Sequence, residues 1–292
     1  MATKIKLPEF KGKALIEVPK NTPQADFLSG DFGKAVLEEY QGRASQDYRG
    51  AGALNVLSYS DGVVKGSNSP AIVLLNQILR PENLRTATQA DLETVLRTGA
   101  LDLKGFYEDS SLVLRSEGDP NSYLAKDLHS QVRERLGRKA KLPVVIPLAG
   151  LDLVNDGNSN YGLAFKLRED AKVIYAPILS EATDKFSQED INSKTGLPKN
   201  LGNGSRTLYT PGNKTGLRGL NLDGGLGLGS LWCGGGLSGS DGFGRVVIVG
   251  GSGEAASRKL GQYTVQLNAA REEYHAKLSA LQTAIGAELK SK

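Results

Sequence analysis

Residues 216–249 read GLRGLNLDGGLGLGSLWCGGGLSGSDGFGRVVIV, and the interpretation of the whole chain depends on this stretch. Leucines recur through it at short intervals, and most positions between them hold Gly, Asn, Asp, Ser or Arg. Leucines two residues apart, as in Leu220 and Leu222, predict a strand with one face in a core. Sixteen of the 36 glycines lie between Gly212 and Gly253. The stretch is therefore either a flexible linker or a folded surface whose exposed positions are free to vary.

The composition is that of a globular protein. The chain has 292 residues, 39% of them hydrophobic and 23% charged, which suits one large domain or two ordinary ones. The net charge is +4 with both signs dispersed, so we expect no nucleic-acid partner. A single cysteine excludes an intrachain disulfide and a cysteine-rich zinc site. Without a long apolar run or the apolar segment of a signal peptide, we expect no membrane span and an intracellular or virion-associated location.

Changes in composition divide the chain into three parts. Residues 1–32 are basic and interrupted by prolines, which predicts an extended arm with one short strand at Ala14–Val18. Residues 33–250 carry the strand and helix signals of the main domain. Residues 254–292 have apolar side chains at a mean spacing close to 3.6, which predicts an amphipathic helix. This helix either packs on the domain or mediates self-association or docking into a larger assembly.

The main domain is predicted to be α+β, with short helices and small antiparallel sheets. In the clearest helix signal, Thr88 caps a helix with Asp91 at its third position, and Gly99 ends it. The other helices are expected at 33–40, 70–79 and 122–136. Strands are expected at 53–58, 111–115, 143–148, 151–154, 161–167 and 172–179, and Pro147 and Pro177 indicate edges or bulges among them. Residues 181–215 are predicted to be a long loop or an inserted hairpin.

Motifs for catalysis are absent from the sequence. It contains no GxSxG elbow, P-loop, HExxH or Rossmann fingerprint. His129 and His275 lie on predicted helices without neighbouring ligands. The run from Asp156 to Asn160 has oxygen ligands at alternate positions, but it lacks the glycine and glutamate of a calcium loop, which favours an ordinary turn. We therefore predict no enzyme activity, no catalytic residue, no metal site and no cofactor.

A second segment makes the leucine-rich stretch recognisable. Residues 85–93, RTATQADLE, resemble the R-L-P-T-E-A-E-W-E helix of C-type-lectin-like domains related to formylglycine-generating enzymes. Arg85, Thr88, Ala90 and Glu93 match identically. The ending from Ser240 to Val247, with its Gly-Arg-Val-Val, is similar to the closing strand of that fold. The resemblance implies a C-type-lectin-like domain over 33–250.

Within that fold, residues 216–249 resemble the variable region of proteins diversified by retroelements in prokaryotes or their phages. In that family, adenines of a template RNA are randomised, typically at AAY codons, which then cannot encode Lys, Glu, Gln, Met or Trp. Residues 215–243 contain none of the first four, and Trp232 is assigned to the scaffold together with the leucines and 244–249. The resemblance implies that the ligand-binding, diversified positions are Arg218, Asn221, Asp223, Gly225, Gly227, Gly229, Cys233, Gly234, Gly235, Ser240, Asp241 and Phe243.

The resulting hypothesis is a non-enzymatic binding protein whose partner is another protein or a cell-surface ligand. One alternative is a structural or virion component in which the glycine-rich stretch is only a tolerant loop. A second alternative is a drifted enzyme of the formylglycine-generating type, whose catalytic cysteine would have to be Cys233. Variable regions usually end such proteins, whereas 254–292 follow here, which implies a separate role for the terminal helix.

Overall fold

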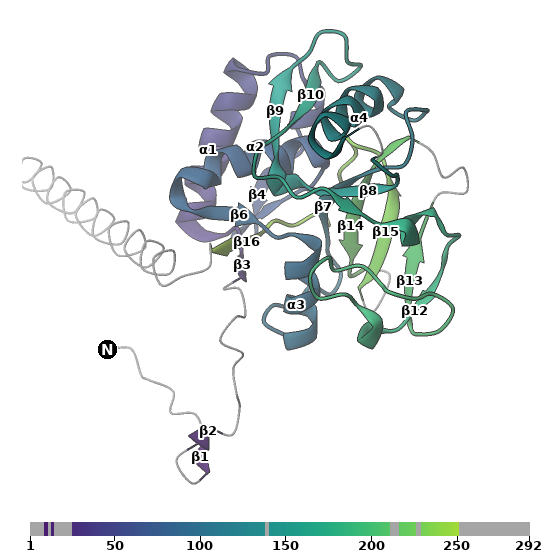
Figure 1. Cartoon of the computed structure of the whole chain (residues 1–292). Helices are drawn as coiled ribbons and strands as arrows, with labels where there is room; N and C mark the ends of the chain where they lie inside the picture. Colours follow the sequence, from purple (N-terminus) through teal and green to yellow (C-terminus); the bar gives the residue numbers. More distant parts are fainter. Residues whose placement is uncertain are drawn as a thin grey trace, which may run out of the picture.

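A computed structural model describes residues 9–10, 13–14, 25–137, 140–210, 216–225 and 229–250. Within these ranges the fold is α+β, with four α-helices and several separate sheets (Figure 1). The expected α+β class is therefore confirmed. The predicted helix over 254–292 and most of the predicted arm over 1–32 lie outside the described residues.

The helices begin and end close to the predicted signals. They are α1 (Gly30–Gln46), α2 (Ser69–Leu79), α3 (Gln89–Thr98) and α4 (Ser122–Leu136). α2 starts where Pro70 fits the first turn and where the Asn68 side chain accepts a hydrogen bond from the backbone N–H of Ala71. α1 is longer than the predicted 33–40.

A seven-stranded sheet runs through the middle of the molecule in the order β11-β8-β7-β14-β15-β13-β12. Its strands are β7 (Tyr107–Leu114), β8 (Val144–Pro147), β11 (Ile174–Tyr175), β12 (Asp184–Phe186), β13 (Arg206–Tyr209), β14 (Leu217–Asp223) and β15 (Ser230–Gly235). All neighbours are antiparallel except β13 and β15, which pair in parallel. The leucine-rich stretch thus supplies two adjacent strands of the main sheet.

Smaller sheets complete the fold. β3 (Ala25–Phe27), β16 (Val247–Gly250) and β6 (Leu84–Thr86) form a three-stranded sheet with β16 in the centre. The other strands form pairs, namely β1 (Glu9–Phe10) with β2 (Lys13–Ala14), β4 (Ser58–Ser60) with β5 (Val63–Lys65), and β9 (Leu151–Asn155) with β10 (Leu163–Leu167). Because β3 pairs with β16, residues 25–27 of the predicted arm belong to a sheet.

Two predicted strands are largely wrong. Over 53–58 the chain forms a 3₁₀ turn at Gly52–Leu54, and β4 starts only at Ser58. The carbonyl groups of Ala53 and Leu54 accept hydrogen bonds from the side chains of Asn68 and Tyr40, so no neighbouring strand satisfies them. Over 172–179 only β11 is extended, and a 3₁₀ turn follows from Pro177, which has no N–H to donate to a ladder.

Each face of the main sheet contributes to a different hydrophobic core. Leu112, Leu114 and Leu217 belong to a core shared with α1, α2, α4 and the β9–β10 pair. Val113 and Leu222 belong to a second core shared with α3 and β16. The alternation of strand residues between the two cores places the helices α2 and α3 on opposite faces of the sheet. β14 therefore contributes to both cores, with Leu217 in the first and Leu222 in the second.

Candidate functional site

The described part of the leucine-rich stretch is folded. Leu217, Leu220, Leu231 and Leu237 are fully buried, and Leu222 is 2% exposed. β14 pairs with β7 on one side and with β15 on the other, so it is a central strand of the sheet. The linker alternative is therefore wrong for 217–223 and 230–235, while Leu226 and Leu228 lie outside the described residues.

The opposite side of the same two strands is partly accessible to solvent, since Asn221 and Asp223 are half-buried and Trp232 is exposed. Asn221 and Asp223 flank buried Leu222, and Trp232 lies between buried Leu231 and Cys233. Period-two alternation therefore directs these three side chains away from the second core. Asn221 and Trp232 are direct partners across the two strands. They form the centre of the surface that we call the outward side of β14–β15.

Trp232 is a contact candidate that the sequence interpretation missed. It is 38% exposed, and its ring lies 5.3 Å from that of Tyr209 on β13. Its assignment to the scaffold stays a prediction, because codon usage says which residues can be replaced but not which side chains face solvent. The signal that could have found it is the position between Leu231 and Cys233 in a strand.

The start of β15 is tied to α3 by a buried ion pair. Arg206 donates to both carboxylate oxygens of Glu93 at 2.6 Å, and its Nε donates to the carbonyl oxygen of Gly229 at 2.7 Å. The guanidinium also stacks on the Phe186 ring at 4.7 Å. Since Arg206 is fully buried, this bidentate pair links α3, β13 and the start of β15 without access to water. No local sequence signal predicts so distant a pairing.

Gly229 is consequently part of the scaffold. It has φ +76°, and a Cβ built on it would lie 2.6 Å from a methyl carbon of Leu96. A larger residue there would adopt an unfavourable backbone conformation, and the Leu96 side chain would have to move to make room for it. The expectation that Gly229 is a freely replaceable position is therefore wrong.

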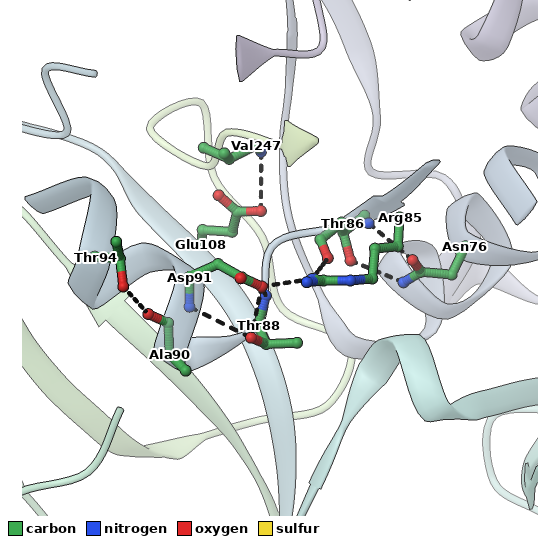
Figure 2. A network of polar contacts seen from close by, with 9 residues as sticks. All are labelled: Asn76, Arg85, Thr86, Thr88, Ala90, Asp91, Thr94, Glu108 and Val247. Atoms are coloured by element: carbon green, nitrogen blue, oxygen red, sulfur yellow. Dashed lines mark hydrogen bonds and ion pairs between the residues drawn. The ribbon is translucent and has the colours of Figure 1, made fainter. Parts of the chain in front are cut away.

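The motif of residues 85–93 holds α3 and the closing strand together (Figure 2). Thr88 and Asp91 form the predicted capping box. Arg85 forms an ion pair with Asp91. On β7, Glu108 accepts a hydrogen bond from the N–H of Val247 on β16 at 2.9 Å. Burial raises the pKa of the Glu108 carboxyl well above its usual value. These motif residues are structural.

The loop from Gly236 to Phe243 mixes structural and exposed side chains. The Ser240 hydroxyl accepts a hydrogen bond from the Ser67 N–H at 2.9 Å and contacts the Tyr107 hydroxyl at 3.1 Å. Tyr107 in turn accepts from the Asp241 N–H, and the Asp241 carboxylate accepts from the Phe243 N–H. Phe243 itself is 66% exposed. Thus Ser240 and Asp241 shape the loop, and Phe243 is its exposed apolar side chain.

Cys233 does not belong to the exposed surface. It is fully buried in the second core, because it has the same orientation in β15 as Leu231. Burial raises the pKa of the thiol to about 11, although the charges of Arg115 and Arg218 oppose the rise. Its assignment as an exposed, replaceable position is wrong. The sequence also gave no indication of Arg115, whose Nη2 lies 3.2 Å from the sulfur.

The remaining candidate positions differ in what they offer a ligand. Arg218 is half-buried and donates to the carbonyl oxygen of Gly234 at 3.0 Å. Gly225 is exposed in a turn, where its N–H donates to the carboxylate of Asp223. Gly235 is at the end of β15, opposite Gly219. Gly227 lies outside the described residues.

His129 and the turn from Asp156 to Asn160 make local structural contacts. Nδ1 of His129 lies 2.6 Å from the Glu117 carboxylate. The Asp156 carboxylate accepts a hydrogen bond from the Asn158 N–H, as in an ordinary Asx turn. Among the described residues, no cluster of three or more His, Cys, Asp or Glu side chains could hold a metal ion. None of the helices in the described ranges is long and apolar enough to cross a membrane.

Comparisons with known proteins add no relative to this picture. No family model, curated protein or solved structure matches the chain. Function is therefore inferred from the geometry of the outward side of β14–β15 and from its sequence.

Proposed function

We propose that the chain is a non-enzymatic ligand-binding protein with a C-type-lectin-like fold, whose exposed residues within 218–243 are diversified by a retroelement. The fold part of this proposal is supported by the two segments that carry the resemblance. β6, which contains Arg85, pairs with β16, which contains Val247. Segments more than a hundred residues apart in the chain are thus neighbours in one small sheet, as segments of a single motif should be.

The observation that carries the functional proposal is the division of β14 and β15 into two sides. The inward side holds leucines and the cysteine, and the outward side holds Asn221, Asp223 and Trp232. An antiparallel strand pair of this kind keeps its fold through one face while the other face varies. This is the property that a diversified recognition surface requires.

The exposed side chains are of the kind that dominates protein interfaces. Tyr209 and Trp232 form an adjacent aromatic pair on neighbouring strands, and Phe243 is exposed in the following loop. Aromatic residues of this type supply much of the binding energy at protein–protein contacts. The partner we propose is a protein or another cell-surface molecule, recognised by the outward side of β14–β15.

Both alternatives raised by the sequence are less well supported. A merely tolerant loop would not need the buried Arg206–Glu93 pair that fixes Gly229. A thiol-dependent enzyme would need an accessible cysteine with a lowered pKa, whereas Cys233 is buried and its pKa is raised. These observations favour binding over catalysis.

The genetic part of the proposal is tested by the nucleotide sequence. We expect a near-repeat of the segment that encodes 216–249 beside a reverse-transcriptase gene, with differences confined to template adenines. We also expect the codons for Arg218, Gly225 and Gly234, which can end in any base, to end in a pyrimidine. If no such repeat exists and these codons end in purines, retroelement diversification is refuted, whatever the protein binds.

A further inference from the structure

Arg115 is buried at the end of β7 without a counter-charge. It is 7% exposed, its Nε and Nη1 make no hydrogen bond, and its Nη2 reaches only the sulfur of Cys233. A thiol whose pKa is about 11 is neutral at physiological pH, so this contact does not neutralise the guanidinium. Burying an unpaired charge is among the most costly arrangements in a protein interior.

Arg218 lies beside it on the neighbouring strand. Val113 is the direct partner of Arg218, and Arg115 follows Val113 by two positions, so the two arginines are diagonal neighbours on one face of the sheet. The Nε of Arg218 is also enclosed and makes no hydrogen bond. The ion pairs formed among the described residues include neither arginine.

The electrostatics agree with this geometry. Burial lowers the pKa of Arg115, the Cys233 sulfur opposes this shift, and the charge of Arg218 adds to it. Two guanidiniums therefore repel each other across the strands while three of their N–H-bearing nitrogens have no acceptor. Arginine presents these donors in a planar fork that matches carboxylate, phosphate and sulfate oxygens.

We propose that Arg115 and Arg218 form a binding site for a small oxyanion, either an inorganic phosphate or sulfate or the carboxylate of a ligand's acidic group. Because these nitrogens are enclosed, the oxyanion enters as the half-buried Arg218 side chain moves; it then accepts hydrogen bonds from the guanidinium nitrogens and neutralises both charges. Arg218 is half-buried, which places one edge of this site at the surface, whereas Arg115 forms its inner wall. The site does not depend on whether the coding segment is diversified.

The test is the thermal midpoint of the full chain, measured during separate titrations with sodium phosphate, sulfate and acetate at constant ionic strength. The variants are Arg115→Gln and Arg218→Gln, and Arg49→Gln is the control because Arg49 is exposed. At an anion concentration ten times its Kd, the parent and the control should gain about 2–4 °C more than the two variants. Subtracting the response of the variants removes the general stabilising effect of sulfate and phosphate.

The three anions distinguish the sources of the ligand. A selective gain with phosphate or sulfate identifies an inorganic anion, and a selective gain with acetate identifies a carboxylate. Arg115→Gln removes an unpaired buried charge, so it should fold at least as well as the parent in buffer without these anions. If it does not fold, the half-buried Arg218→Gln variant provides the comparison. Equal responses of the parent and the available variants to all three anions would overturn the proposal.

Discussion

The two sides of β14–β15 differ in what they require of the sequence. On the inward side, Leu222, Leu231 and Cys233 are enclosed by α3 and the strands around it. On the outward side, Asn221 and Trp232 are partners across the same two strands and face solvent at least in part. A single strand pair therefore combines positions that the fold specifies with positions that it leaves open.

The difference shows that glycine-rich composition alone does not define the replaceable positions. Gly229 is confined by Leu96 and held by Arg206, whereas Gly225 is exposed in a turn. The scaffold thus extends into the loop between the strands, because the Arg206–Glu93 pair fixes its last residue. Freedom to vary depends on what surrounds each residue.

The largest expected effect comes from breaking the buried ion pair. Glu93→Gln leaves the charge of Arg206 buried without a partner and should lower the free energy of unfolding by about 3–5 kcal/mol. Urea denaturation followed by circular dichroism measures the change, with the exposed Arg49→Gln as a near-neutral control. A loss below about 1 kcal/mol would mean that the pair does not anchor the loop.

Truncation on the inward side should have the next largest effect. Leu222→Ala and Leu231→Ala each remove a buried side chain and should cost about 2–5 kcal/mol, including the cavity that remains. The same denaturation experiment measures both variants. If they are as stable as the parent, these strands are not packed against α3 and the division into two sides fails.

Stability should depend on pH through Asp109, a buried carboxyl next to the outward side of β14–β15. Asp109 is the strand partner of Asn221, and burial raises its pKa to about 7 although the Ser67 hydroxyl donates to it and opposes the rise. The folded state therefore holds a proton that the unfolded chain releases near the ordinary aspartate pKa of 3.8, so stability falls as pH rises from about 4 to about 7. The slope from this group is on the order of 1 kcal/mol per pH unit.

Asp109→Asn isolates that contribution. The variant keeps a group that can accept from Ser67 but cannot ionise, so its stability should change less steeply with pH between about 4 and 7. Denaturation of parent and variant at several pH values gives the difference directly. Parallel pH profiles would show that Asp109 ionises in the folded protein as it does in the unfolded chain.

The smallest effect is expected on the outward side itself. Asn221→Ser and Phe243→Ser should change the free energy of unfolding by no more than about 0.5 kcal/mol, since Phe243 is 66% exposed and the enclosed amide oxygen of Asn221 accepts no hydrogen bond that the substitution would remove. Thermal and urea denaturation are the measurements. A loss of 2 kcal/mol or more in either variant would assign that residue to the scaffold.

The sequence predicts the local features of this molecule well. The capping box of Thr88 and Asp91, the proline at the start of α2 and the bounds of α4 all arise from contacts within one or two turns. The burial of Leu220 and Leu222 likewise follows from their spacing. Such signals are readable because both partners lie close together in the chain.

What the sequence could not supply are the contacts between distant segments. Arg206 pairs with Glu93 across more than a hundred residues, and Arg115 approaches Cys233 over a similar distance. The strand order that brings them together depends on the packing of the whole sheet. The exposure expected for Cys233 is a different kind of error. Its position next to Trp232 in a strand already indicates that the two side chains point in opposite directions, but it does not say which of them faces the core.

The most direct test of the central claim compares two libraries of equal size. One randomises the outward positions Asn221, Trp232 and Phe243, and the other randomises the inward positions Leu220, Leu222 and Leu231. The fraction of clones that display a protease-resistant domain is measured for each. We predict that most outward clones fold, that few inward clones do, and that the folded outward clones yield binders to different protein targets. Equal folded fractions in the two libraries would contradict the account.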